Sequence, residues 1–197
     1  MENLIQSNQI SSDMLTFVEG GLFATFYNYP DLTAQKATLQ TGGIDFSSTA
    51  CSQLECVVDD WHPQVSVKKF TDDDHISARW RGFVRVPYPQ KFTFGSALLE
   101  SDERVKVWVD NALIIDMWDS LVAISPSQTV QFGCSDVGAF IPLEVEYKDI
   151  SGAQGLRLVW ESHEVATIPR QIIPPAVLAT SVQRQMLPML TKSERKS

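Results

Sequence analysis

Apolar and polar residues alternate in several short segments of the chain, and this period of two is typical of a β-strand with one buried face. The alternation is clearest in residues 76–80, 105–109, 141–147 and 156–160. Further short runs, rich in β-branched and aromatic residues, occupy residues 22–27, 83–86, 91–96, 113–116 and 129–132. About nine strands without a convincing central helix predict an all-β sandwich or barrel.

The N-terminal residues show a different pattern, because polar residues there surround one short apolar run. Ser11, Ser12 and Asp13 precede this run, which ends at Gly20. Such residues cap helix N-termini, so a short helix is expected within a leading arm that spans residues 1–19.

Three later segments lack clear alternation. Residues 42–74 are weakly periodic, and a loop of this length is a place to look for a functional site. Residues 168–175 are apolar but contain three prolines, which predicts an extended strap along the sandwich. We expect one domain over residues 20–178, followed by a basic tail or linker over residues 179–197.

Composition and charge narrow the possible partners. The chain has 197 residues, 44% hydrophobic and 20% charged, as in globular proteins. No apolar run approaches the roughly 18 residues that cross a bilayer, and the N-terminus lacks a signal-peptide pattern. Sixteen basic and twenty-four acidic side chains give a net charge of −8, which disfavours binding to phosphates. We therefore expect neither a nucleic-acid partner nor a membrane span.

The cysteines and asparagines bear on the cellular location. Cys51, Cys56 and Cys134 are odd in number and too few for a disulfide scaffold, and no asparagine begins a glycosylation site. These features favour an intracellular protein if Met1 is the native start. They fit an extracellular or cell-surface location if the chain is a fragment of a secreted protein.

The long loop carries two candidate groups of metal ligands. Asp72, Asp73 and Asp74 offer oxygen ligands for calcium, although three adjacent aspartates are more often a solvated loop. Cys51 and Cys56 leave three arrangements open: a zinc site with the histidines, a disulfide, or two reduced thiols, which we favour.

Two further acidic segments flank predicted strands. Asp102 and Glu103 precede a strong strand, while Asp116 and Asp119 follow a hairpin, so strand pairing is expected to bring them to the same end of the sandwich. Turn formation is the alternative role for these residues. Trp118 lies between the two aspartates and is the best candidate for stacking on a sugar, whereas Trp80, Trp108 and Trp160 lie inside strand patterns and fit packing better.

Catalytic signatures are absent from the sequence, which contains no Gly-x-Ser-x-Gly elbow, no phosphate-binding glycine loop and no His-Glu-x-x-His motif. No pair of carboxylates stands out as the acid and base of a glycosidase. We therefore expect a protein that is not an enzyme.

Several motifs, in order and spacing, carry a resemblance to a known family. They are Gly21–Tyr27, Ile76–Gly82, Tyr88–Phe94, Ser101–Asp116, Val145–Tyr147, Leu156–Trp160 and Ile173–Pro174. Together they resemble the domain named after the N-terminal fragment of the anthrax protective antigen, over about residues 20–178. The resemblance implies an antiparallel β-sandwich of the kind found in adhesins, β-glucosidase inserts and toxins.

The resemblance also implies a site. In sugar-binding members two consecutive aspartates bind calcium, which in turn binds sugar hydroxyls. The matching positions here are Asp102 and Glu103, with Arg104 where the family usually has glycine. Asp102, Glu103 and Asp116 are therefore the candidate calcium ligands. This requires that Glu103, whose side chain is one methylene longer, take the place of the second aspartate. It must do so beside the positive charge of Arg104.

Two functions follow as expectations. The first is carbohydrate recognition by a non-catalytic module, with or without calcium, at a site that contains Asp102, Glu103, Trp118 and Asp119. The second is a structural or protein-interaction role in a larger assembly, which is intracellular if Met1 is the native start. The altered aspartate pair and the missing secretion signals favour this second function.

Overall fold

The computed structural model describes residues 15–47, 75–98, 102–120, 122–151 and 155–183. Its strands are β1 (Leu15–Glu19), β2 (Leu22–Tyr27), β3 (Gln35–Thr41), β4 (Asp45–Ser47), β5 (Ser77–Arg85), β6 (Lys91–Leu98), β7 (Arg104–Val109), β8 (Ala112–Asp116), β9 (Ser127–Gln131), β10 (Phe140–Lys148), β11 (Gly155–His163), β12 (Thr167–Ile172) and β13 (Leu178–Gln183). Two single-turn 3-10 helices, η2 (Cys134–Asp136) and η3 (Pro175–Val177), complete the regular structure of these residues. The predicted all-β fold is confirmed.

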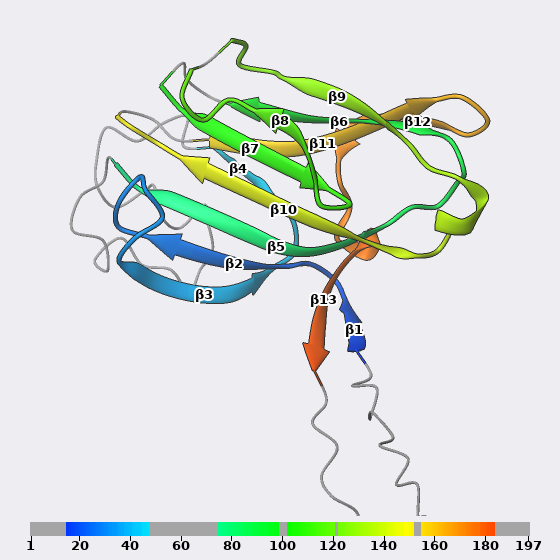
Figure 1. Ribbon diagram of the computed structural model, residues 1–197, viewed down its shortest axis with the longest axis horizontal. Coiled ribbons are helices and arrows are strands. Elements are labelled where there is room, and N and C mark those ends of the chain that lie inside the picture. The colour runs from blue at the N-terminus through cyan, green and yellow to red at the C-terminus, as the bar shows by residue number, and fades with distance from the viewer. Residues whose placement is uncertain (1–14, 48–74, 99–101, 121, 152–154, 184–197) are drawn as a thin grey trace, which may run out of the picture.

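The strands form two antiparallel sheets that pack face to face (Figure 1). The eight-stranded sheet has the order β1-β13-β5-β10-β7-β8, and β2 joins it by pairing with both β5 and β3. The five-stranded sheet has the order β12-β11-β6-β9, with β4 also paired to β11. The antiparallel sandwich expected from the resemblance is therefore present.

The core lies between the sheets and consists of the inward residues of the alternating segments. Trp80 and Trp160 are 2% exposed, and Tyr147 is fully buried. Phe92 packs against Trp160 with ring centroids 5.0 Å apart. The predicted alternation is thus the alternation between core and surface, since successive side chains of a strand point to opposite faces.

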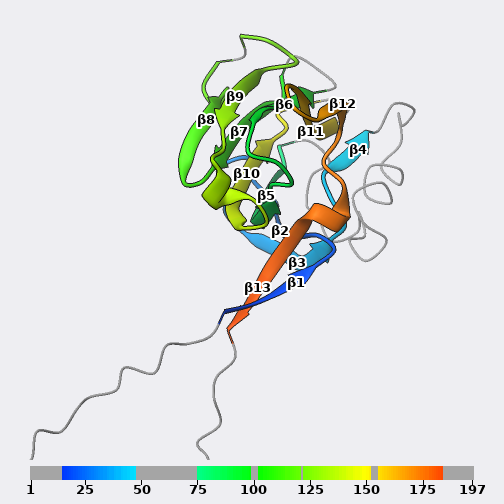
Figure 2. The ribbon, with the colours of Figure 1, turned by 90° about the vertical axis from the view of Figure 1, so that its right-hand side faces the viewer.

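The predicted N-terminal helix is wrong, because residues 15–19 form β1. This strand pairs along its length with β13, from Leu15 opposite Gln183 to Glu19 opposite Ala179. The pair leaves the sandwich as a two-stranded ribbon (Figure 2). Phe17 joins β1 to the sheet, with its ring stacked on Phe140 at 4.3 Å and edge-on to Phe83 at 4.9 Å. Pairing and aromatic packing outweigh the local capping signal.

The domain boundaries at residues 20 and 178 stay a prediction, although the eight-stranded sheet extends beyond both. β13 continues from residue 178 to residue 183, within the segment expected to be a tail. The expected strap is a strand, since β12 pairs with the edge of β11 and Pro169 lies within it. Proline is tolerated there because an edge strand leaves one row of backbone groups unpaired.

Gly82 marks the point where two strands meet along one edge of β5. β2 pairs with the first part of β5, up to Arg81, and β13 pairs with Phe83 and Val84. A Cβ atom at Gly82 would lie 2.4 Å from the carbonyl oxygen of Ala179 and 2.7 Å from Leu22 Cδ2. The missing side chain therefore lets β13 approach β5.

Part of the expected site region lies outside the described residues: Asp72, Asp73, Asp74, Cys51, Cys56 and His62. Cys134 is described and is an exposed free thiol. Among the helices of the described residues, none has the length and apolar character that a membrane span requires.

Candidate functional site

The carboxylates of Asp102 and Glu103 bind other parts of the protein. Asp102 Oδ2 accepts hydrogen bonds from the Ser151 backbone N–H at 2.7 Å and from the Ser151 hydroxyl at 3.0 Å. Glu103 is fully buried, and its Oε1 accepts hydrogen bonds from the Tyr147 hydroxyl at 2.6 Å and from the backbone N–H of Gly155. These bonds fasten the start of β7 to the end of β10 and the start of β11.

Tyr147 is affected strongly by this arrangement. Its pKa is raised well above the ordinary value, first by burial and then by the negative charges of Glu103 and Asp149. The neutral phenol is therefore the form that donates to Glu103. Pairing a buried carboxylate with a hydroxyl and a backbone N–H lowers the cost of burying its charge.

The structure brings the other candidate residues to the same end of the sandwich, as the hairpin argument expected. Asp116 lies opposite Lys106 in the β7–β8 pair, and its Oδ1 accepts the Trp118 backbone N–H at 3.2 Å. Asp116 and Asp119 are exposed, and Trp118 is half-buried. Asp116 thus shapes the turn that contains Trp118.

Two lysines pack against Trp118. The ammonium nitrogens of Lys148 and Lys106 lie 4.4 Å and 5.4 Å from the centroid of the indole. The pKa of Lys148 is lowered, first by burial and also by the charges of Arg104 and Lys106, although Asp119 acts in the opposite direction. Cationic side chains therefore surround the tryptophan that the sequence indicates for sugar stacking.

The described residues do not fit a calcium site. Calcium takes six to eight oxygen ligands, several of them carboxylates. Across the described ranges, no three His, Cys, Asp or Glu side chains are grouped so that they could hold a metal ion. The carboxylates of Asp102 and Glu103 are engaged within the protein, and Asp116 binds the backbone of Trp118.

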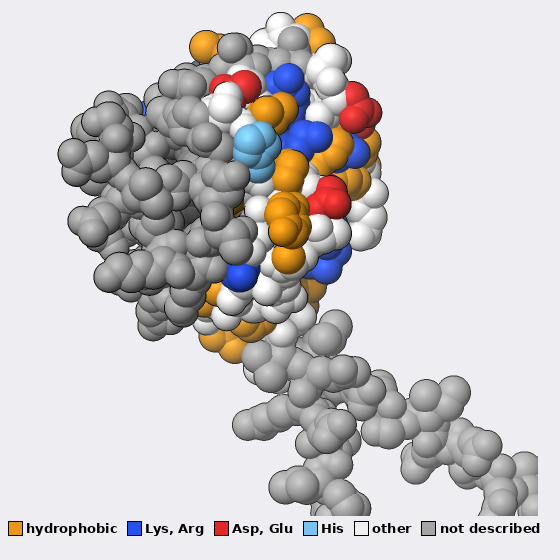
Figure 3. Space-filling view, turned by 90° about the vertical axis from the view of Figure 1, so that its left-hand side faces the viewer, with side chains coloured by type: hydrophobic (Ala, Val, Ile, Leu, Met, Phe, Trp, Pro, Cys, Tyr) orange, Lys and Arg blue, Asp and Glu red, His pale blue; other side chains and the backbone are white. Residues whose placement is uncertain are grey.

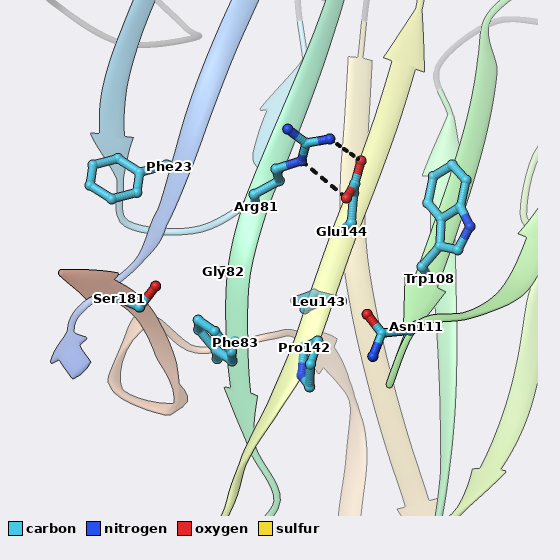
Figure 4. A pocket seen from close by; sticks show the side chains of 10 residues that line it. All are labelled: Phe23, Arg81, Gly82, Phe83, Trp108, Asn111, Pro142, Leu143, Glu144 and Ser181. Carbon is cyan, nitrogen blue, oxygen red and sulfur yellow. Dashed lines mark hydrogen bonds and ion pairs between the residues drawn. The ribbon is translucent and has the colours of Figure 1, made fainter. Parts of the chain in front are cut away.

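A second candidate site is an open groove on the outer face of the eight-stranded sheet, with a cavity volume of about 270 Å³. Four of its side chains form one row across adjacent strands, because Phe23 lies opposite Arg81, Arg81 opposite Glu144, and Glu144 opposite Trp108. Figure 4 shows Phe23 and Trp108 at the two sides, with Arg81 and Glu144 between them. Three strand spacings make this row about 14 Å wide.

The centre of the groove is polar, and its charged side chains are paired with one another. Arg81 donates to Glu144 through two parallel hydrogen bonds of 3.0 and 3.1 Å. The bond to Glu144 raises the pKa of Arg81, and burial opposes it. Arg79 adds a second cation, because its Nε lies 3.3 Å from Glu144 Oε1, the oxygen that Arg81 Nη2 also binds, and its Nη2 contacts Glu146. The pairs hold planar donors and acceptors in fixed positions.

The groove also offers aromatic surface and further polar groups. Phe23 is 40% exposed and Trp108 half-buried. Asn111, in the tight β7–β8 turn, lines the groove, and its amide makes no hydrogen bond to any part of the chain that the structure describes. Ser181 of β13 lies on the opposite side. Such a surface suits a ligand with one apolar face and several hydroxyl groups.

The sequence analysis does not predict the groove, although the positions of two aromatic residues indicate an exposed apolar surface. Phe23 and Trp108 occupy outward positions of strands whose inward residues already fill the core. Aromatic residues at outward positions indicate an exposed apolar surface, which often marks an interaction site. Their grouping with Arg81 and Glu144 depends on strand register, which the sequence alone does not reveal.

Comparison with known proteins identifies the fold. The model of the PA14 domain matches residues 20–171 of the chain. The chain belongs to the PA14 domain family. The resemblance to the protective-antigen domain is therefore confirmed.

Individual relatives of this PA14 domain differ in kind. The anti-sigma-I factor RsgI3 of Acetivibrio thermocellus is 30% identical over 142 residues, which are 70% of this chain and 20% of that protein. An anti-sigma factor domain-containing protein from Clostridium clariflavum is 28% identical, with a TM-score of 0.63, over 84% of this chain and 48% of that one. The chain thus spans about a fifth and about half of these two relatives.

A third relative shares the fold at low identity. The epithelial adhesin 9 A domain of Candida glabrata, solved in complex with Galβ1-3GlcNAc, has a TM-score of 0.62 and 10% identity. The alignment covers 86% of this chain and 91% of the adhesin chain. The likeness shows a common fold.

Proposed function

We propose that this PA14 domain is a non-catalytic module that recognises carbohydrate in the groove of the eight-stranded sheet. The cross-strand row of Phe23, Arg81, Glu144 and Trp108 carries the proposal, because two aromatic rings flank a fixed guanidinium and carboxylate. The adhesin domain of the same fold that was solved with Galβ1-3GlcNAc adds support.

The chemistry of the row matches that of a saccharide. The C–H face of a sugar ring is apolar and packs on Phe23 or Trp108, while its hydroxyls donate to Glu144 and accept from Arg81 and Asn111. Charged partners strengthen these hydrogen bonds. The row is wider than one six-membered ring, so the groove suits an oligosaccharide.

Affinity electrophoresis tests the proposal. The protein is run through gels that contain a neutral soluble polysaccharide, in turn a β-glucan, a galactan, a xylan and a mannan, with EDTA present. We expect retardation in at least one gel. Trp108→Ala and Phe23→Ala are expected to weaken that binding by about tenfold each, which corresponds to the loss of one aromatic packing contact.

Tyr88→Ala is the matched control, because Tyr88 is 43% exposed, close to the 40% of Phe23, and lies outside the groove. Its retardation should equal that of the wild type. Circular dichroism checks that each variant is folded. If no saccharide retards the wild type, or if the groove variants bind as tightly as Tyr88→Ala, the proposal is wrong.

A protein-interaction role is the second candidate. It is supported by the identity of 28–30% to anti-sigma factor proteins, against 10% to the sugar-bound adhesin. This candidate predicts that no neutral or acidic saccharide retards the wild type. Binding that depends on Trp108 would contradict it.

A further inference from the structure

The corner around Trp118 holds three cationic side chains. Lys106 and Lys148 lie over the indole, and Arg104 is the cross-strand partner of Lys148. All three lie on the outer face of the eight-stranded sheet, Arg104 and Lys106 on β7 and Lys148 at the end of β10. Figure 3 looks at this end of the sandwich and shows Lys and Arg side chains gathered beside apolar ones.

The positive charge of the two lysines is only partly balanced, whereas the Arg104 guanidinium already donates to the Glu103 carbonyl oxygen at 2.9 Å. Neither Lys106 nor Lys148 makes an ion pair with any residue that the structure describes, in a chain whose net charge is −8. Two opposing charges lie on the Trp118 turn: Asp116, opposite Lys106 in the β7–β8 pair, and Asp119, whose charge raises the pKa of Lys148. Burial is the main cause of the lowered pKa of Lys148, Asp119 opposes it, and the positive charges of Arg104 and Lys106 add to the lowering.

The indole positions the lysines without neutralising them. A cation–π contact holds an ammonium group by the electrostatic field of the ring and leaves its charge and N–H donors for another partner. Lys91 shows the contrast, because its ammonium is paired with Glu164 at 3.4 Å. The nearby carboxylates of Asp102 and Glu103 are turned to Ser151 and Tyr147, so they do not compete for the lysines.

We propose that Lys106, Lys148, Arg104 and Trp118 form a second binding site for an anionic group on a saccharide, either a uronate carboxylate or a sulfate ester. This inference rests on the proposed carbohydrate recognition and names a ligand class for it. The site binds without a metal ion, because side-chain cations supply the positive charge. Arg104, Lys106 and Trp108 occupy alternate positions of β7, so their side chains lie on one face of the sheet. The second site is therefore on the same face as the groove, which Trp108 lines.

The experiment uses gels with sodium polygalacturonate, dextran sulfate or neutral dextran, all with EDTA. Wild-type protein should be retarded by polygalacturonate or dextran sulfate and not by dextran; the two acidic polymers distinguish the carboxylate from the sulfate. The double variant K106M/K148M keeps the methylene stems and removes both charges. We expect it to bind the acidic polymer about tenfold more weakly. Lys36→Met is the control, because Lys36 is exposed on another strand.

A variant with the opposite effect sharpens the test. Asp119→Asn removes a negative charge that acts on Lys148, so it should strengthen retardation by the acidic polymer. Equal losses in Lys36→Met and K106M/K148M would mean a general charge effect and would overturn the site. So would the absence of retardation by either acidic polymer.

The outcomes separate this site from the groove. If a neutral polysaccharide binds through Trp108 and K106M/K148M changes nothing, the second site is wrong and the proposed function stands. If acidic polymer binds through Lys106 and Lys148 while Trp108→Ala has no effect on any saccharide, the groove is wrong and the second site stands.

Discussion

At the scale of single residues, Glu103 connects the sequence of this domain to its stability. Its buried carboxylate accepts from Tyr147 and from the Gly155 backbone. Glu103→Ala leaves both donors without this acceptor, at about 1–3 kcal/mol for each, so we expect the free energy of unfolding to fall by about 2–6 kcal/mol. Urea denaturation at pH 7 measures the change.

Asp119→Ala is the control for this variant, because Asp119 is an exposed carboxylate at the same end of the sandwich. Its free energy of unfolding should stay within about 0.5 kcal/mol of the wild type. Similar losses in the two variants would contradict a structural role for Glu103.

Tyr147 gives a prediction about alkaline pH. Because its pKa in the folded protein is raised, the unfolded chain releases this proton first, above about pH 10. The folded state then binds more protons, so wild-type stability falls with rising pH by up to about 1.4 kcal/mol per unit from this residue. Tyr147→Phe lacks this contribution. We expect it to be less stable than the wild type at pH 7 and the gap to narrow above pH 10.

Urea denaturation of both proteins between pH 7 and pH 11 measures this effect. A gap that stays constant would mean that the Tyr147 hydroxyl titrates alike in both states. Tyr88→Phe is the control at pH 7, because it removes an exposed hydroxyl and should leave stability unchanged.

The sequence indicates which residues matter at this scale but not where they point. Asp102 and Glu103 stand out by their likeness to a calcium-binding pair, yet their partners are Ser151, Tyr147 and Gly155, which lie 44 to 52 residues later. The direction of a short acidic side chain depends on such distant donors. A local pattern contains no information about them.

At the scale of elements, Gly82 is the clearest case of a residue dictated by its neighbours. In Gly82→Ala the new Cβ would lie 2.4 Å from the Ala179 carbonyl oxygen. Because this oxygen belongs to the backbone of β13, the clash is relieved only if the strand shifts. We expect a loss of about 1–3 kcal/mol and faster hydrogen exchange in β13. Hydrogen exchange by mass spectrometry compares β13 with the core strand β10.

Gly43→Ala is the matched control for Gly82→Ala. A Cβ at Gly43 would lie 3.6 Å from the Ile173 carbonyl oxygen, which is ordinary contact. This variant should be as stable as the wild type or slightly more stable, because alanine restricts the unfolded chain. If exchange in β13 stays slow in Gly82→Ala, the close approach is not needed.

The elements that could be predicted are those with one face in the core. Segments such as 105–109 and 141–147 alternate because Val105, Val107 and Tyr147 point into the core while their neighbours lie on the outer face of the sheet. β3, with the sequence QKATLQT, has only weak alternation at the sheet edge. The local sequence of β1 predicts a helix, because its strand partner, β13, lies some 160 residues away and leaves no local signal. Edge strands are defined by pairing more than by composition.

At the scale of the whole molecule, the sandwich brings distant parts of the chain into one surface. Phe23 and Glu144 are separated by about 120 residues, yet only β5 lies between their strands. The fold class follows from the pattern of strands, and the PA14 family from motif order. The groove follows from neither, because its composition depends on strand order and register together.

The role of calcium is also tested at the scale of the whole molecule. A site occupied at 100 times its dissociation constant adds about 2.7 kcal/mol, and for a domain of this size that raises the unfolding temperature by several degrees. The carboxylates of Asp102, Glu103 and Asp116 are held by Ser151, Tyr147, Gly155 and the Trp118 backbone. We therefore expect calorimetry to give the same unfolding temperature in millimolar calcium and in EDTA. A rise that calcium produces and magnesium does not would contradict this and would require ligands beyond the described carboxylates.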